Sequence, residues 1–315
     1  MTAREDVRRA LAHLQAIAPG PADDTIEKIL ATVRRAMTVY GDATARPPLE
    51  GVAAIPCDAD GVPCEWIVPQ AAIEDERIVH CHGGSLIAGS FDSHRPMLSV
   101  LARAARRPVL SVGYRLAPEY PYPTAHQDCQ KAFAWAAAHG PRERSPARRL
   151  ALSGDSVGAA LAVAACADAI ANRSRAPDCM VLIGAVALAG SVAERPDRDS
   201  DKLINNAAMQ AIALYAGQTP LDDPNLSSLN HDDAVLSCFP PVLLQVGAPE
   251  FLLFDSVALA NRLARLNRRA VLSVWPDMPH VWHHFTTHLP EAEMAVAEAA
   301  QFIDESCEGP ADHES

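Results

Sequence analysis

The chain has 315 residues, a formal net charge of −12 at pH 7 and 49% hydrophobic residues. That length suffices for one large domain, or for a domain with a small cap, and the acidic balance argues against nucleic acid as a partner. The eight cysteines include no Cys-x-x-Cys pair, which argues against a zinc ribbon or redox motif and suits free thiols in a reducing compartment. Without a secretory signal or an apolar run of about 20 residues, we expect a cytoplasmic protein that binds no membrane.

Two amphipathic helices precede the first predicted strand. Residues 4–18 place apolar side chains at helical spacing as far as Pro19-Gly20-Pro21, and a second apolar face runs from Ile26 to Met37. The apolar faces of such helices need a partner that comes later in the chain. We therefore expect residues 1–45 to be cap helices over a sheet domain, rather than a detached hairpin or a membrane anchor.

Strands and helices alternate through the remainder of the chain. Residues 51–57 and 62–69 predict a hairpin around Asp58-Ala59-Asp60-Gly61. The further strands are predicted at 78–81, 108–113, 150–153, 180–188, 242–246 and 271–274, and the helices at 95–106, 124–139, 157–172, 254–266 and 291–304. Nearly all-apolar strands separated by helices are typical of a parallel α/β sheet that is covered on both faces.

A charged, proline-containing run from Glu194 to Lys202 interrupts this alternation, and a predicted helix over 205–217 follows it. We predict that residues 194–235 are an insertion that joins residues 1–45 as a cap. The sheet domain then comprises residues 46–193 and 236–307, and residues 308–315 form a polar tail.

The segment Ser153-Gly154-Asp155-Ser156-Val157-Gly158 joins a predicted strand to a helix of small residues. It places Ser156 on a sharp turn with glycine at −2 and +2, positions where a Cβ would clash. Ser156 is therefore a candidate nucleophile, and the Val157 N–H at the helix N-terminus is a candidate donor to negative charge beside it. The motif alone is weak, because an ordinary glycine-flanked turn has the same pattern.

A serine hydroxyl needs a base that takes its proton and a third group that orients the base. In a doubly wound sheet, such groups lie in loops after the later strands. The loop after residues 242–246 supplies Glu250 and Asp255, and the loop after residues 271–274 supplies His280. Serine, acid and histidine in this chain order are typical of the α/β-hydrolase architecture.

A candidate oxyanion hole follows the predicted strand 78–81 directly. His82-Gly83-Gly84-Ser85 contains two adjacent glycines, whose backbone N–H groups are open to an approaching oxyanion. Gly83 and Gly84, together with Val157, are the predicted donors.

Four motifs in this order resemble those of the bacterial hormone-sensitive-lipase-like esterases: residues 82–84, 114–119, 154–158 and 278–282. The resemblance covers about residues 78–285. It implies an α/β-hydrolase fold with an eight-stranded, mostly parallel sheet, a helical cap, and activity on short acyl esters without a metal or cofactor. It also implies that Ser156 is the nucleophile, that His280 is the base, and that Gly83, Gly84 and Val157 donate to the oxyanion.

The chain departs from the family pattern at two positions. Ser85 stands where the family usually has a third glycine, which weakens any inference about the substrate. Glu250 stands where members commonly have aspartate. We assign Glu250 as the acid that orients His280, ahead of Asp255, which we expect to support the start of a helix.

These features predict a serine carboxylesterase that hydrolyses short- to medium-chain esters through an acyl-enzyme intermediate. Its expected partners are a small-molecule ester or lactone and, as in many relatives, a second copy in a homodimer. A lactone hydrolase with the same triad and a non-catalytic ligand-binding protein on this fold are the alternatives. We interpret Asp155 as an ordinary carboxylate at a helix N-terminus, His82 as a loop-fixing residue, and the histidines at 280, 283, 284 and 288 as no metal site.

Overall fold

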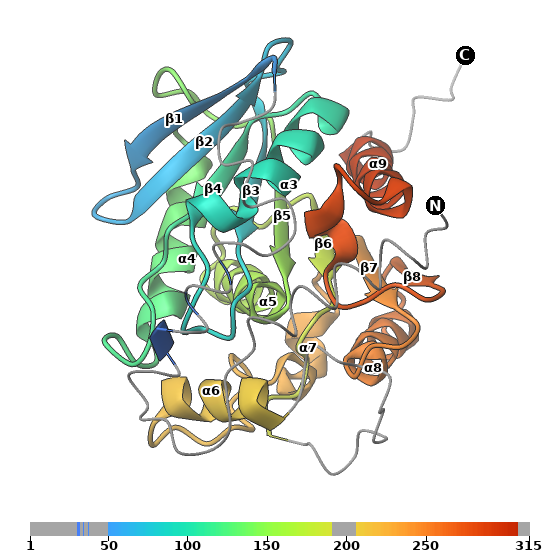
Figure 1. Cartoon of the computed structure of the whole chain (residues 1–315). Coiled ribbons are helices and arrows are strands. Elements are labelled where there is room, and N and C mark those ends of the chain that lie inside the picture. Colours follow the sequence, from blue (N-terminus) through green and yellow to red (C-terminus); the bar gives the residue numbers. More distant parts are fainter. Residues whose placement is uncertain (1–29, 32–33, 35–36, 38–49, 191–205, 308–315) are drawn as a thin grey trace.

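The computed structural model describes residues 30–31, 34, 37, 50–190 and 206–307 of the chain. Its centre is an eight-stranded sheet in the order β1-β2-β4-β3-β5-β6-β7-β8 (Figure 1). The strands are β1 (Val52–Asp58), β2 (Pro63–Pro69), β3 (Glu76–Cys81), β4 (Val109–Val112), β5 (Arg149–Asp155), β6 (Cys179–Ile183), β7 (Val242–Gly247) and β8 (Ala270–Trp275). The pairs β1–β2 and β2–β4 are antiparallel and the other neighbours are parallel, which confirms the predicted, mostly parallel sheet.

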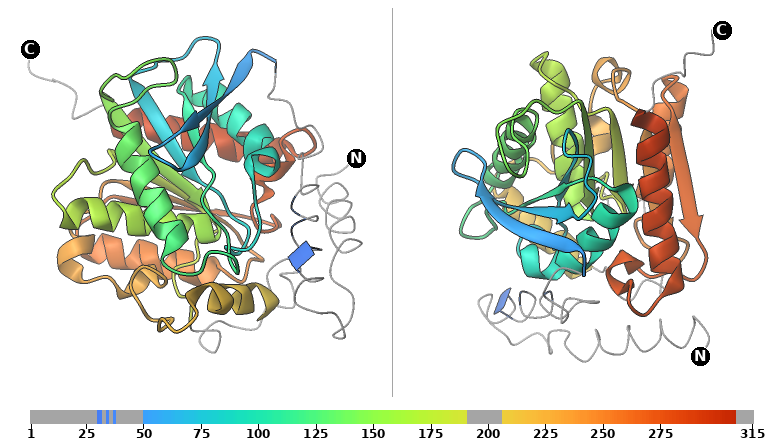
Figure 2. Two further views of the ribbon diagram at one scale, coloured as in Figure 1. Left: turned by 90° about the vertical axis from the view of Figure 1, so that its left-hand side faces the viewer. Right: turned by 90° about the horizontal axis from the view of Figure 1, so that it is seen from above.

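Helices cover both faces of this sheet (Figure 2). On one face, α3 (Phe91–Ala105) packs against α9 (Pro290–Cys307), and Leu98 and Phe302 belong to one core cluster with Ile78 of β3. The other face carries α4 (Thr124–Ala136), α5 (Val157–Ala171) and α8 (Leu253–Arg265), which share the larger core cluster. The two-sided burial explains why the central strands are almost entirely apolar.

Two predicted element ends differ from the structure by four or five residues, each for a local reason. Helix α3 begins at Phe91, four residues before the predicted 95, because Ser90 caps it: Ser93 N–H donates to Ser90 Oγ at 3.3 Å and Ser90 N–H donates to Ser93 Oγ at 2.9 Å. Strand β6 ends at Ile183 rather than at residue 188, because Gly184 adopts a φ of +52° and turns the chain out of the sheet.

The connection between β6 and β7 differs from the other crossovers. Its described part contains α6 (Asn206–Ala216), the short 3₁₀ helix η2 (Ser228–Asn230) and α7 (Asp233–Leu236), and α6 lies along the bottom of Figure 1. Residues 194–205 of the predicted insertion and the predicted helix over 4–18 lie outside the described residues. Of the second predicted N-terminal helix, Leu30, Ala31, Arg34 and Met37 are described; all four are helical, and Leu30 is buried.

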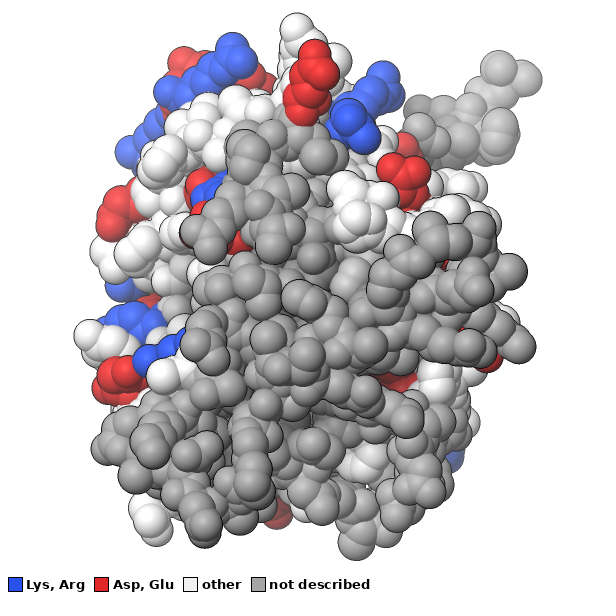
Figure 3. Space-filling model, in the orientation of Figure 1, with Lys and Arg blue, Asp and Glu red and all other residues white. Residues whose placement is uncertain are grey.

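Charged side chains of both signs are interspersed over the described part of the face in Figure 3. The net charge of −12 is therefore not gathered into one acidic patch on the described part of that face. Within the described ranges, none of the helices combines the length and the apolar character that crossing a membrane requires.

A buried polar contact joins α6 to α4. His126 on α4 lies between Tyr215 on α6 and the backbone at Asn225: its Nδ1 is 2.8 Å from the Tyr215 hydroxyl and its Nε2 is 2.9 Å from the Asn225 carbonyl oxygen. A neutral imidazole satisfies both neighbours when Nε2–H donates to the carbonyl and Nδ1 accepts from the hydroxyl. Burial lowers the pKa of His126 to about 4.

This contact predicts a loss of stability on acidification. Between about pH 6.5 and pH 4 the unfolded chain binds a proton at residue 126 that the folded protein excludes, so the contribution of His126 is present above pH 6.5 and lost as the pH falls. We expect this one histidine to account for about 2 kcal/mol of the difference in unfolding free energy between pH 7 and pH 5. Urea unfolding at the two pH values, with His126→Gln alongside, measures it; an equally steep pH dependence in the variant contradicts the assignment.

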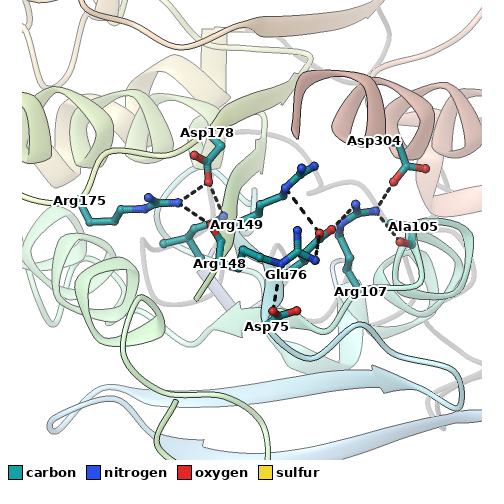
Figure 4. A network of polar contacts seen from close by, with 10 residues as sticks. Asp75, Glu76, Ala105, Arg107, Arg148, Arg149, Arg175, Asp178 and Asp304 are labelled. Atoms are coloured by element: carbon teal, nitrogen blue, oxygen red, sulfur yellow. Dashed lines mark hydrogen bonds and ion pairs between the residues drawn. The ribbon is translucent and has the colours of Figure 1, made fainter. Parts of the chain in front are cut away.

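A network of ion pairs lies at the amino-terminal ends of β3 and β5, opposite the strand ends that carry the candidate site (Figure 4). The buried carboxylate of Glu76 pairs with Arg107, with Arg148 at 2.5 Å and with Arg149 at 3.6 Å. Arg107 also binds Asp304 on α9, so this network ties the last helix to the centre of the sheet.

Removing the Glu76 charge should destabilise the fold, because Arg107 is buried and would lose a neutralising partner. For Glu76→Gln we expect a loss of about 3 kcal/mol in unfolding free energy, since breaking a buried pair is strongly destabilising and Arg107 then keeps only the half-exposed Asp304 as an ionic partner. The matched control is Glu305→Gln at the exposed pair with Arg269, where we expect a much smaller loss because water screens the pair. Denaturant unfolding compares the two variants. Equal losses of unfolding free energy would show that the Glu76 network contributes no more than a surface ion pair.

Candidate active site

Ser156 occupies a strained corner between β5 and α5. Its backbone adopts φ 55° and ψ −122°, and residues other than glycine rarely adopt a positive φ. The residue is 7% exposed. The Ser156 N–H donates to the Ile183 carbonyl at the end of β6 at 2.8 Å, which helps to hold the corner.

The two glycines that flank the serine are required by close backbone contacts. A Cβ on Gly154 would lie 2.2 Å from the carbonyl oxygen of Gly158, and a Cβ on Gly158 would lie 2.0 Å from that of Cys81. Both distances are far below any tolerated carbon–oxygen contact, so the corner can form only with glycine at both positions. This confirms the steric role that the sequence predicts for them.

Glu250 and His280 come together above the end of the sheet. His280 Nδ1 is 2.6 Å from Glu250 Oε2, and Glu250 Oε1 accepts the Gly247 N–H at 2.6 Å. Glu250 is 1% exposed and His280 is 7% exposed. Because the carboxylate faces Nδ1, it favours the tautomer with the proton on Nδ1, which leaves Nε2 as a proton acceptor.

The imidazole of His280 lies against the turn that also holds Ser156. A Cβ on Gly184 would be 2.7 Å from His280 Cε1 and 3.0 Å from Glu250 Oε2, so the ring packs directly on this glycine. Gly184 follows Ile183, whose carbonyl accepts the Ser156 N–H, and the Val186 N–H donates back to the Ser156 carbonyl at 3.3 Å. The segment 183–186 therefore contacts both the serine corner and the histidine.

Asp255 lies at a different place from Glu250. It is buried at the start of α8, and its Oδ2 accepts the N–H groups of Ala187 at 2.7 Å and Leu188 at 3.0 Å. Those bonds hold the irregular segment after β6. Of the two predicted acids, Glu250 is hydrogen-bonded to His280, and Asp255 supports a neighbouring loop.

The loop 82–85, which we predict to carry the oxyanion donors, is held by a hydrogen bond at Gly83. The Gly83 N–H donates to Asp155 Oδ1 at 3.0 Å, so it is already engaged and faces the protein interior. An N–H that is engaged in this way favours Gly84 and Val157 over Gly83 among the three predicted donors. Among the described residues, the N–H groups of Gly84, Ser85 and Val157 have no hydrogen-bond acceptor.

Comparison with known proteins places this geometry in a family. Residues 78–284 match the family described as alpha/beta hydrolase fold. The chain is 34% identical over 272 residues to an acetyl-hydrolase of Streptomyces hygroscopicus, covering 85% of this chain and 86% of that protein. It is 31% identical over 237 residues to an ethyl acetate hydrolase of Pseudomonas putida, covering 73% and 74%.

A solved structure agrees with these relatives. An esterase from the bacterial hormone-sensitive lipase family superposes with a TM-score of 0.85 at 32% identity, over 98% of this chain and 100% of that one. The chain belongs to the hormone-sensitive-lipase-like family of α/β-hydrolases.

Sequence reasoning missed a buried polar cluster in this hydrolase that holds the loop 82–85. Asp155 Oδ1 lies 3.1 Å from His80 Nε2 and 3.2 Å from His94 Nε2, and all three residues are buried. Although burial opposes ionisation, His94 and His80 hold the pKa of Asp155 well below its usual range. The interpretation of Asp155 as an ordinary helix-terminal carboxylate is therefore wrong, because its carboxylate binds the Gly83 amide and fixes the loop.

Within the part of the hydrolase that the structure describes, these three residues form a group whose side-chain atoms could bind a metal ion. Their donor atoms lie within 4.8 Å of one another. However, Asp155 Oδ1 already accepts the Gly83 N–H, and His80 Nδ1 lies 3.2 Å from Ser153 Oγ. The hydrogen bonds of His80 and Gly83 to Asp155 thus account for much of the arrangement, and His94 Nε2 lies within ion-pair distance of the same oxygen.

His82, the first residue of the loop 82–85 of this hydrolase, is held in the neutral form. Its Nδ1 is 2.7 Å from the Gly83 carbonyl oxygen, its ring stacks on Tyr114 at 4.1 Å, and the Tyr114 hydroxyl donates to its carbonyl at 2.7 Å. Burial lowers the pKa of His82 to about 3. These contacts agree with a loop-fixing role.

Proposed function

We propose that this member of the family is a serine carboxylesterase that hydrolyses short- to medium-chain acyl esters through an acyl-enzyme intermediate. The observation that carries the proposal is the buried Glu250–His280 hydrogen bond, formed beside the turn that holds the strained Ser156 corner. A nucleophile on a sharp turn, a base beside it and an acid that orients the base are the parts that acyl transfer needs.

In the proposed reaction, Ser156 Oγ attacks the ester carbonyl carbon while His280 Nε2 takes the hydroxyl proton. Glu250 holds the Nδ1–H and stabilises the imidazolium that forms. The imidazolium then gives its proton to the departing alcohol, which leaves an acylated serine. Water repeats the sequence: it attacks the acyl carbon, His280 takes its proton, and the acid and free serine are released.

The negative oxygen of the tetrahedral intermediate needs donors that the fold has not already used. We assign this role to the N–H groups of Gly84, Ser85 and Val157, in place of the set that included Gly83. Val157 adds the positive end of α5, since it is the first residue of that helix. Donors of this kind are worth about 3–4 kcal/mol each in the transition state.

The names of two relatives, an acetyl-hydrolase and an ethyl acetate hydrolase, support an ester with a short acyl chain as substrate. We further propose that residues 1–45 and 194–235 form the cap that bounds the acyl site. The contacts of α6 with α4 through His126 and Tyr215 support a docked position for the described part of that insertion.

A substrate panel tests the proposal directly. The purified protein is assayed on p-nitrophenyl esters from acetate to dodecanoate and on six- and seven-membered lactones, and labelled in parallel with a fluorophosphonate. We expect turnover to be fastest on the shorter esters and the label to be lost in Ser156→Ala. Preferred turnover of lactones would replace the ester assignment, and an unlabelled wild-type protein without turnover would favour a ligand-binding role.

A further inference from the structure

An arginine from the N-terminal part of the chain reaches the oxyanion loop. Arg34 Nε donates to the carbonyl oxygen of Ile87 at 2.7 Å, and one of its terminal nitrogens donates to that of Ala117 at 2.9 Å. The same guanidinium binds both carboxylate oxygens of Glu119, at 2.8 Å and 2.7 Å. One side chain therefore joins the loop 82–90 to the loop 114–119.

The backbone that carries Arg34 is itself anchored. Leu30 and Met37 lie four residues before and three residues after it, on the same face of a helix. Leu30 belongs to the main core cluster and Met37 packs against it. The guanidinium thus extends from a helix whose apolar face is fixed to the core, so its two carbonyl contacts restrain the loops.

The loop segment that Arg34 holds is strained. Gly84, Ser85 and Leu86 have consecutive positive φ values of 114°, 54° and 64°. Residues other than glycine keep such values only where their surroundings hold them in place. Here the Leu86 carbonyl accepts the Ala117 N–H at 2.9 Å, and the next carbonyl, that of Ile87, accepts from Arg34.

These restraints act on the same short turn that carries two of the assigned oxyanion donors. The N–H groups of Ile87 and Ala88 donate to the Gly84 carbonyl at 3.2 Å and 2.9 Å, so a shift of the Ile87 peptide is passed to the peptide between Gly84 and Ser85. That peptide contains the Ser85 N–H. Its direction therefore depends on contacts that lie outside the triad.

We propose that Arg34 is a positioning residue that keeps the Ser85 N–H aimed at the oxyanion. This inference depends on the proposed esterase function. The planar guanidinium fork binds a carboxylate and two carbonyl oxygens at once, which a lysine ammonium on a flexible stem does not reproduce with the same geometry. The N-terminal segment would thus contribute to transition-state stabilisation as well as covering the sheet domain.

The test compares Arg34→Ala and Arg34→Lys with the control Arg262→Ala, on p-nitrophenyl butyrate. Arg262 is closely matched: its guanidinium binds the carbonyls of Leu229 and His231 and the Asp233 carboxylate, and its side chain is 30% exposed against 35% for Arg34. For Arg34→Ala we expect kcat to fall about 10-fold while KM changes less than about 2-fold, because misaligned donors weaken the transition state selectively. Arg34→Lys should restore part of kcat.

A trifluoromethyl ketone, which forms a tetrahedral adduct with the serine, gives a second readout. Its inhibition constant should weaken in Arg34→Ala by the same factor as kcat/KM and stay unchanged in Arg262→Ala. A rise in KM with kcat unchanged, or equal losses in both alanine variants, would overturn the role of Arg34. Absence of ester turnover in the wild-type protein would instead contradict the proposed function, so the two failures are distinguishable.

Discussion

Replacing Ser156 by alanine is expected to lower kcat for a short p-nitrophenyl ester by about 10⁴- to 10⁶-fold. The hydroxyl that would form the acyl-enzyme is removed, while the oxyanion donors and the substrate contacts remain. The residue is small and lies at the end of a strand, so alanine leaves no large cavity. Steady-state kinetics and the melting temperature are measured together.

The fold should be retained in this variant, because the backbone hydrogen bonds of residue 156 to residues 183 and 186 do not involve the hydroxyl. Loss of fluorophosphonate labelling is the second expected result. If Ser156→Ala kept more than about one hundredth of wild-type kcat, another residue would be the nucleophile, and the acyl-enzyme mechanism at this corner would be abandoned.

Replacing Glu250 by glutamine is expected to lower kcat by about 10³- to 10⁴-fold with little change in KM. An amide at this position has no negative charge to stabilise the imidazolium, and it can turn its NH₂ group toward His280 Nδ1, which favours the wrong tautomer. The 2.6 Å contact between Glu250 Oε2 and His280 Nδ1 is the geometry on which this expectation depends.

Asp255→Asn is the matched comparison, since it makes the same chemical change at a buried acid in the same loop and helix region. Its carboxylate oxygen accepts two backbone N–H groups after β6, so the change should lower the melting temperature more than it lowers kcat. Loss of turnover in Asp255→Asn with near-normal turnover in Glu250→Gln would reverse the assignment of the acid.

The alternating pattern and the two glycines were enough to predict the sheet and the corner at Ser156. Apolar strands alternating with helices are typical of a parallel sheet covered on both faces, and glycines at 154 and 158 fit a sharp turn at Ser156 because a Cβ at either position would clash. These are local properties, because periodicity and the absence of a Cβ act within a few residues of each other.

Which groups face one another depends on how distant elements pack together. Glu250 and Asp255 lie five positions apart in the chain, yet one is hydrogen-bonded to His280 and the other holds the backbone after β6. Gly83 and Gly84 are indistinguishable in sequence, but the amide of the first is engaged by Asp155, whose own position depends on His80 and His94 from other elements. The contact of Arg34 with residues 87 and 117 has no local signature either, because hydrogen bonds between distant segments are set by the packing of whole elements.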